Sequence, residues 1–248
     1  MERNINSLIG CHLEAKDGRI GEVVEFYFDD KTWKIRYLIV RLGHPLNSRQ
    51  VLISPDALLR TTGQKELFSV HLTKEQINKS PNIDTDKPVS RQQEIELYGH
   101  YGWPAYWIGG LNSGGNLEDT TPIQVTDEKN MDQINANKKP DADLYLCSTA
   151  RVTGYTIYAN DGEIGHVNDF IFDDQTWQLV NFVVDTQSWA GGEKVLIAVE
   201  HIKELVWQKF EVFLDMTIAG VKNSPLFDAL KYKAIETGNT VKPTGNSL

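Results

Sequence analysis

The hexapeptide Phe28-Asp29-Asp30-Lys31-Thr32-Trp33 (FDDKTW) returns 144 residues later as FDDQTW at positions 172–177. With this offset the chain aligns on itself without a gap, residues 10–53 against residues 154–197. Of the 44 aligned pairs, 17 are identical, which chance does not produce over an ungapped segment of this length. The chain of 248 residues is therefore an internal duplication, and such self-similarity indicates a repeated structural unit.

Each copy has the pattern of short β-strands joined by tight turns. Asp17-Gly18 and Asp161-Gly162 are turn dipeptides, because glycine accepts a positive φ. The runs beyond these turns are rich in β-branched and aromatic residues, which favours strands at 23–28, 34–41, 51–54, 67–72, 179–184, 195–198 and 210–214. Because no helical segment separates the first strands of a copy, we expect antiparallel pairing. Closure into a barrel then removes exposed sheet edges.

The duplication divides the chain into four segments. Residues 1–80 form the first repeat and residues 146–225 the second, while residues 226–248 are a C-terminal extension whose end we expect to be disordered. The segment 81–145 begins with a predicted helix over 91–101 and continues as a Gly- and Asn-rich linker. A shorter helix is predicted to start at Thr73, with Gln76 completing a capping box. The predicted fold class is mainly β, with two small barrels.

The charge pattern limits the classes of partner. The net charge is −9, with +2 on residues 1–80 and −6 on each of the segments 81–145 and 146–225. A nucleic-acid binder needs a basic face that displaces counterions, so the balance excludes DNA and argues against RNA. No apolar run approaches the roughly 20 residues that span a bilayer. The first residues lack the charged, apolar and small-residue segments that follow one another in a signal peptide. We therefore expect a cytoplasmic protein.

The segment from Gly21 to Ile53 resembles a PRC-barrel domain, with its FDD turn, the strand after Trp33 and the motif VLISP at 51–55. That family shares its fold with the cytoplasmic domain of the photosynthetic reaction-centre H subunit and with the C-terminal domain of the ribosome maturation factor RimM. The segment 88–107 resembles the tail of many stand-alone bacterial members. The resemblance implies two small SH3-like β-barrels packed as an intramolecular pair. It also implies a barrel used for contacts, without shared catalytic residues.

The repeated acidic turns are candidate cation sites. Asp29 and Asp30, with Asp173 and Asp174, place two adjacent carboxylates on each hairpin, and carboxylate oxygens bind Ca²⁺ or Mg²⁺. The alternative is an Asx-type turn in which aspartate accepts backbone N–H groups. A complete shell for a hard cation needs about six oxygens. Two adjacent carboxylates supply few of these, so the pattern favours the turn.

An aromatic segment is the candidate partner-binding site. Five aromatic residues fall within ten positions, punctuated by glycine and proline: Tyr98, Tyr101, Trp103, Tyr106 and Trp107. Tyrosine and tryptophan dominate the hot spots of protein interfaces, which favours a contact anchor. The alternative is a plug packed between the two barrels, because a large exposed apolar patch is a liability.

No pattern in the sequence indicates catalysis. The histidines lack metal-ligand spacing, the glycine pairs do not fit a phosphate-binding loop, and no serine lies in a nucleophile elbow. We therefore expect a non-enzymatic protein without a cofactor that acts as an interaction or assembly scaffold, with a protein partner and possible homo-oligomers. One alternative is a small-molecule or divalent-cation-binding protein that uses the inter-barrel cleft or the FDD turns. A second alternative is a ribosome- or RNA-associated factor.

Overall fold

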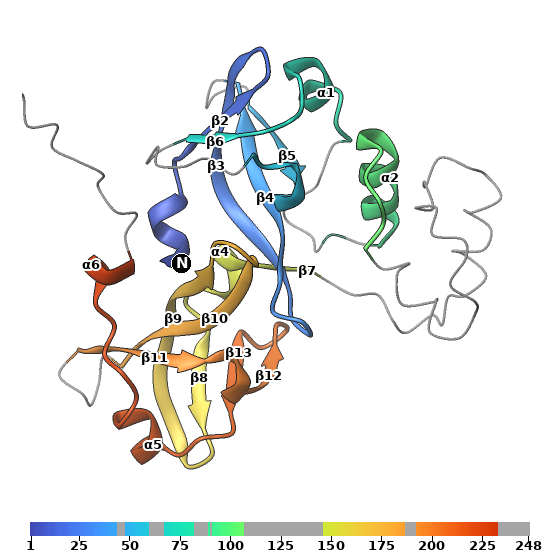
Figure 1. The fold of residues 1–248 in the computed structure, drawn as a ribbon. Coiled ribbons are helices and arrows are strands. Elements are labelled where there is room, and N and C mark those ends of the chain that lie inside the picture. The colour runs from blue at the N-terminus through green and yellow to red at the C-terminus, as the bar shows by residue number, and fades with distance from the viewer. Residues whose placement is uncertain are drawn as a thin grey trace, which may run out of the picture.

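A computed structural model describes residues 1–43, 48–59, 67–81, 89, 91–106, 146–186 and 192–232. The fold is mainly β, as the sequence predicts, and it contains two sheets, one for each repeat. Figure 1 shows the first repeat in blue and cyan above the second repeat in yellow and orange, with the N-terminus and α4 between them. Among the described residues, no helix is long and apolar enough to cross a bilayer.

The sheet of the first repeat has the order β5-β4-β3-β2-β6. Its longest strand, β3, combines glycine near its start with the apolar run that ends at Phe28, and all its last four residues are buried. The elements of this repeat are β2 (His12–Ala15), β3 (Gly18–Asp29), β4 (Ile35–Leu42), β5 (Arg49–Ile53), the 3-10 helix η3 (Pro55–Ala57), β6 (Leu67–Ser69) and α1 (Lys74–Asn78).

The sheet of the second repeat has the order β11-β10-β9-β8-β13-β12. Its strands follow the first repeat at the same offset, and β12 is an additional strand that pairs with β13. The elements are β8 (Thr156–Ala159), β9 (Gly162–Asp173), β10 (Gln178–Asp185), β11 (Lys194–Ala198), η4 (Val199–His201), β12 (Ile202–Val206), β13 (Glu211–Leu214), α5 (Ile218–Lys222) and α6 (Ala229–Tyr232).

The expectation of purely antiparallel pairing is wrong at one place in each repeat. Strand β6 pairs with β2 in parallel, and β13 pairs with β8 in parallel. Parallel neighbours need a long crossover. The long connection between β2 and β6 supplies it, because the chain passes through β3, β4 and β5 before it returns.

Two further strands are exchanged between the repeats. The N-terminal strand β1 (Glu2–Asn4) pairs with β9 of the second repeat, and β7 (Leu146–Ser148) pairs with β3 of the first repeat. The registers are equivalent at the offset of 144, since Glu2 faces Asp173 where Leu146 faces Asp29. Each repeat therefore completes the sheet of the other. Each exchanged strand continues into a short helix, η1 (Ile5–Leu8) or α4 (Thr149–Val152).

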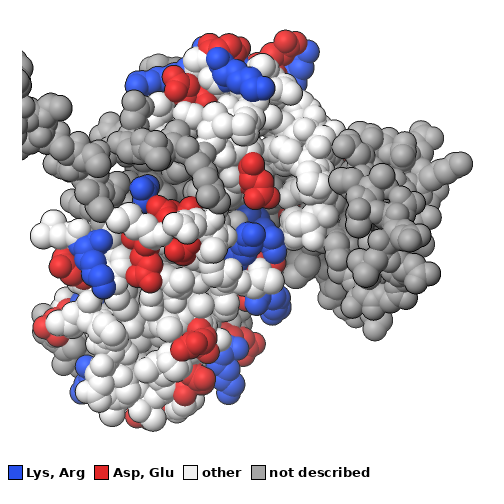
Figure 2. All heavy atoms as spheres, viewed as in Figure 1, with Lys and Arg blue, Asp and Glu red and all other residues white. Residues whose placement is uncertain are grey.

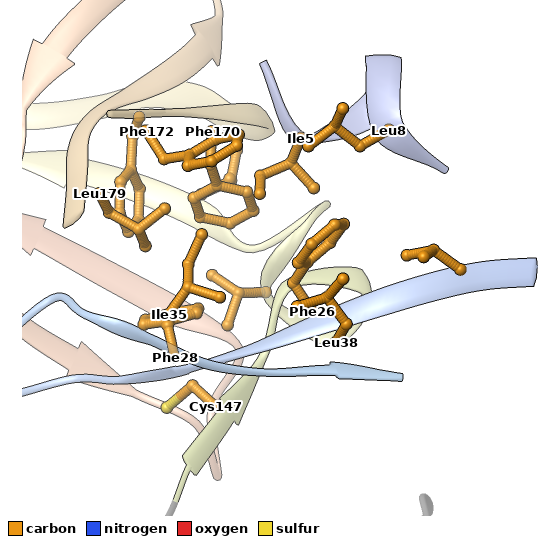
Figure 3. Close-up of a cluster of buried hydrophobic side chains, with 14 of the residues drawn as sticks. Ile5, Leu8, Phe26, Phe28, Ile35, Leu38, Cys147, Phe170, Phe172 and Leu179 are labelled. Atoms are coloured by element: carbon orange, nitrogen blue, oxygen red, sulfur yellow. The ribbon is translucent and has the colours of Figure 1, made fainter. Parts of the chain in front are cut away.

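One continuous apolar core joins the two repeats. Figure 3 shows Phe26 and Phe28 of β3 facing Phe170 and Phe172 of β9, with Ile5 of η1 beside them. The rings of Phe28 and Phe170 lie 5.8 Å apart, so aromatic contact crosses directly from one repeat to the other. Both cysteines, Cys11 and Cys147, are buried in this core and are not joined in a disulfide. The barrels consequently form one folded unit.

Two helices of the first repeat and its tail begin where the sequence predicts. The helix α1 is capped by Thr73, whose side chain accepts from the amide of Gln76 while Gln76 accepts from the amide of Thr73. The helix α2 (Arg91–Tyr101) lies beside the first repeat in Figure 1. It covers the face of the first sheet that points away from the shared core. In the second repeat, Phe227 and Tyr232 cover the corresponding face.

Candidate functional site

The first aspartate of each FDD motif forms the hairpin turn. The Oδ1 atom of Asp29 accepts hydrogen bonds from the backbone N–H groups of Lys31 and Thr32, at 2.9 and 3.1 Å. Asp173 accepts those of Gln175 and Thr176 at 3.0 and 2.9 Å. These are the contacts of the Asx-type turn. Burial opposes ionisation of Asp29, but these amides and the guanidinium of Arg36 outweigh it and lower its pKa.

The second repeat adds charge contacts to its hairpin. The amino group of Met1 lies 3.2 Å from Asp173 and 2.8 Å from Asp174, and Arg3 Nε lies 3.0 Å from Asp174. The amide of Thr176 leads the contacts that lower the pKa of Asp173 to about 2, although desolvation opposes them. Within the described part of the chain, no group of three or more His, Cys, Asp or Glu residues is placed to hold a metal ion. The cation site at Asp29, Asp30, Asp173 and Asp174 stays a prediction.

The tryptophan that ends each FDD motif reaches into the other repeat. Trp33 and Trp177 have φ angles of 56° and 58°, in the left-handed region that bulky residues rarely adopt. This turn directs the ring of Trp33 edge-on to Phe182 of the second repeat, at 5.6 Å. Trp177 stacks on Phe172 at 5.2 Å and contacts Phe26 of the first repeat at 6.5 Å. Core packing between the repeats therefore compensates the strained backbone.

Two carboxylates, the buried Asp169 and the partly buried Glu25, bind the exchanged segments. Asp169 of β9 accepts from the side-chain amide of Asn4 at 2.8 Å and from the backbone of Asn6 at 3.2 Å. At the equivalent position, Glu25 of β3 accepts from the hydroxyl of Ser148 and from the backbone of Ala150. Burial raises the pKa of Glu25 to about 7, against the amide of Ala150 and the positive charge of the neighbouring arginine. Both carboxylates hold the exchange in place.

The aromatic segment packs on the outer face of the first sheet. Tyr98 is 4% exposed, and its ring meets Tyr37 of β4 edge-on at 6.5 Å. Tyr101 and Trp103 stack at 4.3 Å and are partly buried. The segment mainly covers the side of the sheet opposite the shared core, and Tyr101 and Trp103 also pack against the shared core, so the plug between the barrels stays a prediction. Trp107 lies outside the described residues, and partner binding by this segment stays a prediction.

A buried glutamate fixes the end of the aromatic segment. Glu94 of α2 is fully buried, and one of its carboxylate oxygens accepts the hydroxyls of Tyr37 at 2.8 Å and Tyr106 at 2.9 Å. Burial and the charge of Glu94 raise the pKa of Tyr37 well above its usual value. The guanidinium of Arg36 lies 3.9 Å from the centre of the Tyr106 ring and also contacts Asp29. The network connects the aromatic segment to the FDD hairpin.

Two adjoining clefts mark the junction between the repeats. The first has a volume of about 450 Å³ and extends from Arg3 past Phe68 to Trp177. The second has a volume of about 290 Å³ and extends from Lys34 to Tyr106. Both clefts are bounded by Pro55 and Asp56 of η3 and by Gln175 and Trp177 of the second hairpin. Together they form a groove, which we call the junction groove.

Sequence reasoning identified some of these residues and missed others. It singled out Tyr98, Tyr106 and the FDD hairpins, which line or border the junction groove. It missed Glu25 and Asp169, because a carboxylate in a strand pattern carries no sign of its distant partner. Their equivalent positions in the two repeats, each acidic within a buried strand, are the signal that was available.

One family of known proteins matches the sequence. The family model of the PRC-barrel domain matches twice, at residues 1–69 and at residues 148–215. A search of the curated proteins finds no match. The two matched segments together span more than half of the chain, and each contains the strands of one sheet apart from the exchanged strand.

Proposed function

The chain belongs to the PRC-barrel family and carries the domain twice, and from this premise we propose that it is a non-enzymatic scaffold for protein–protein interactions. The observation that carries the proposal is the division between core and surface. The residues that both repeats share, above all the FDD hairpins and their tryptophans, lie in the turn and in the common core. Exposed positions that differ between the repeats, such as Arg19 against Glu163 and Lys31 against Gln175, are available for contacts.

The contacts of three carboxylates that are withdrawn from solvent support a scaffold rather than a reaction centre. Glu25 and Asp169 hold exchanged segments, and Glu94 holds two tyrosine hydroxyls. Each of these carboxylates thus has a structural partner that accounts for its position. On the face that Figure 2 shows, acidic and basic side chains are interspersed, which suits contacts with a protein more than with a uniformly charged polymer.

The test is affinity capture from a lysate of the source cell. The tagged full-length protein serves as bait, and an excess of the untagged protein serves as competitor in a matched sample. We expect at least one protein that is captured at a fixed ratio and released by the competitor. A protein that captures nothing specific, yet turns over a compound in a metabolite screen, contradicts the proposal.

A second candidate function is ligand binding in the junction groove, which its volumes favour because small-molecule sites typically measure about 300–1,000 Å³. A thermal-shift panel of metabolites and divalent ions tests it, since a ligand that binds only the folded state raises the unfolding midpoint. For a cation at the FDD turns, the suitable variants are Asp30→Asn and Asp174→Asn. They spare Asp29 and Asp173, whose carboxylates form the turns.

A further inference from the structure

Aromatic, aliphatic and charged residues together line the junction groove. The partly exposed rings of Trp177 and Phe68 line the first cleft 6.3 Å apart, and the fully buried Phe172 stacks on Trp177. Leu59 adds an aliphatic side chain that is 39% exposed. The groove continues past Asp56 into the second cleft, where Tyr98 and Tyr106 line it. Its elongated form, across parts of both repeats, suits an extended chain better than a compact molecule.

Most charges of the first cleft are already paired. Arg3 lies 3.0 Å from Asp174, which also receives the amino group of Met1. Asp56 is exposed and forms no ion pair with any residue that the structure describes. Lys34 lines only the second cleft. The first cleft thus offers an available carboxylate beside aromatic rings.

We propose that the junction groove binds an extended segment of a partner protein and places a lysine or arginine of that segment in the first cleft, with its cation at Asp56. The aliphatic stem of such a side chain packs on apolar surface while its charged end stays at the rim. Aromatic faces attract cations, which adds to the pull of the carboxylate. The net charge of −9 favours the approach of a basic partner.

This inference rests on the proposed scaffold function. A peptide of defined sequence tests binding in the groove separately from that function. The probe is a fluorescein-labelled decapeptide of alternating lysine and serine, and its binding to the full-length protein is followed by fluorescence polarisation. The same peptide with acetylated lysines keeps the stems and removes the charge. We expect the lysine peptide to bind more tightly than its acetylated form, with an affinity that falls as salt rises.

The repeat supplies a matched control. Asp56→Asn and Glu200→Gln each remove one exposed carboxylate at equivalent positions of η3 and η4, but only Asp56 lines the groove. We expect Asp56→Asn to weaken binding about five- to tenfold and Glu200→Gln to leave it within twofold. Leu59→Ser, at an exposed position on the first cleft, is expected to weaken binding as well.

Either of two results with the peptide overturns the inference: equal losses for Asp56→Asn and Glu200→Gln, which indicate diffuse attraction by net charge, or no binding of the lysine peptide. Its failure is distinct from that of the scaffold function. If affinity capture yields competed partners whose recovery is the same with the Asp56→Asn bait, the scaffold proposal stands and the groove proposal falls.

Discussion

Lys34 and Gln178 pair with each other across the molecule, although they occupy the same position in two copies of one repeat. On either side of this bridge the backbone bonds are reciprocal: Ile35 donates to the carbonyl of Trp177, and Leu179 donates to that of Trp33, both at 2.8 Å. The bridge therefore marks a local twofold axis between the repeats. Together with the exchanged strands β1 and β7, it makes the chain a fused equivalent of a symmetric dimer.

The exchange predicts that the halves hold together without a covalent link. Expressed as two separate chains, residues 1–106 and 146–232 are expected to elute as a 1:1 complex in size-exclusion chromatography. A shorter second half that starts at residue 150 lacks β7 and Thr149, whose hydroxyl donates to Phe26. It is expected to bind the first half far more weakly. Equal association of the long and short forms contradicts the structural importance of the exchanged strand.

Trp33 and Phe210 both have positive φ angles, but we expect substitution by glycine to change the free energy of unfolding differently at the two positions. Trp33→Gly relieves backbone strain but removes a ring that packs between the repeats, so it should lower the free energy of unfolding by about 3 kcal/mol. Phe210 has a φ of 60° and is 55% exposed. Phe210→Gly should stay within about 1 kcal/mol of wild type, because strain relief offsets the lost contact. Urea denaturation measures both, and a larger loss at Phe210 than at Trp33 contradicts this account.

Gly21 and Gly165, at equivalent positions of the two repeats, leave no space for a Cβ atom, whereas Gly99 does. A Cβ atom at Gly165 would lie 2.0 Å from the carbonyl oxygen of Asp185, and one at Gly21 would lie 2.4 Å from that of Arg41. Gly165→Ala and Gly21→Ala should each cost about 3 kcal/mol, since backbone cannot yield cheaply. Gly99 lies in α2 with no heavy atom within 4 Å of such a Cβ. Gly99→Ala should stabilise the fold by about 0.5–1 kcal/mol. Thermal unfolding ranks the three variants.

The raised pKa of Glu25 predicts a pH dependence of stability. Below its folded-state value of about 7, the folded protein takes up a proton that the unfolded chain binds only near its ordinary pKa of 4.5. Stability should therefore rise as pH falls from about 7.5 to 4.5, and this gain should be lost as pH rises through 7. Glu25→Gln, which can still accept from Ser148, should remove this component and exceed wild type in stability at pH 8.

Denaturation midpoints at pH 5 and pH 8 measure the effect of Glu25. Glu163→Gln, at an exposed position of β9, serves as the control and should keep the wild-type pH dependence. If Glu25→Gln and wild type respond equally to pH, the carboxylate does not titrate in this range.

Local patterns made much of the fold predictable. The structure confirms the capping box at Thr73 and Gln76 and the helix over 91–101. Both could be predicted because they depend on residues that are neighbours in the sequence. The exchange was not predictable. Strands β1 and β7 have three residues each, ERN and LCS, which share no residue and lie outside the ungapped alignment. Their pairing is set by a sheet edge more than a hundred residues away.

The candidate site was predictable only in part. The different residues after the VLI motif, Ser54-Pro55 against Ala198-Val199, are visible in the sequence, and the first pair borders the junction groove. The groove itself forms because Trp177 of the second repeat lies beside the first repeat. No spacing of residues in the sequence predicts this contact. The position of α2 could not be predicted either, because an aromatic segment fits equally well against either face of a sheet.

The local axis at Lys34 and Gln178 has an evolutionary consequence. In a homodimer every substitution appears twice, and the two residues on the axis are always identical. Fusion of the subunits into one gene lifts this restriction and makes assembly independent of protein concentration. A lysine can then face a glutamine, and one side of the molecule can acquire a groove with an aromatic segment that the other side lacks. The shared core keeps the halves together while their surfaces evolve separately.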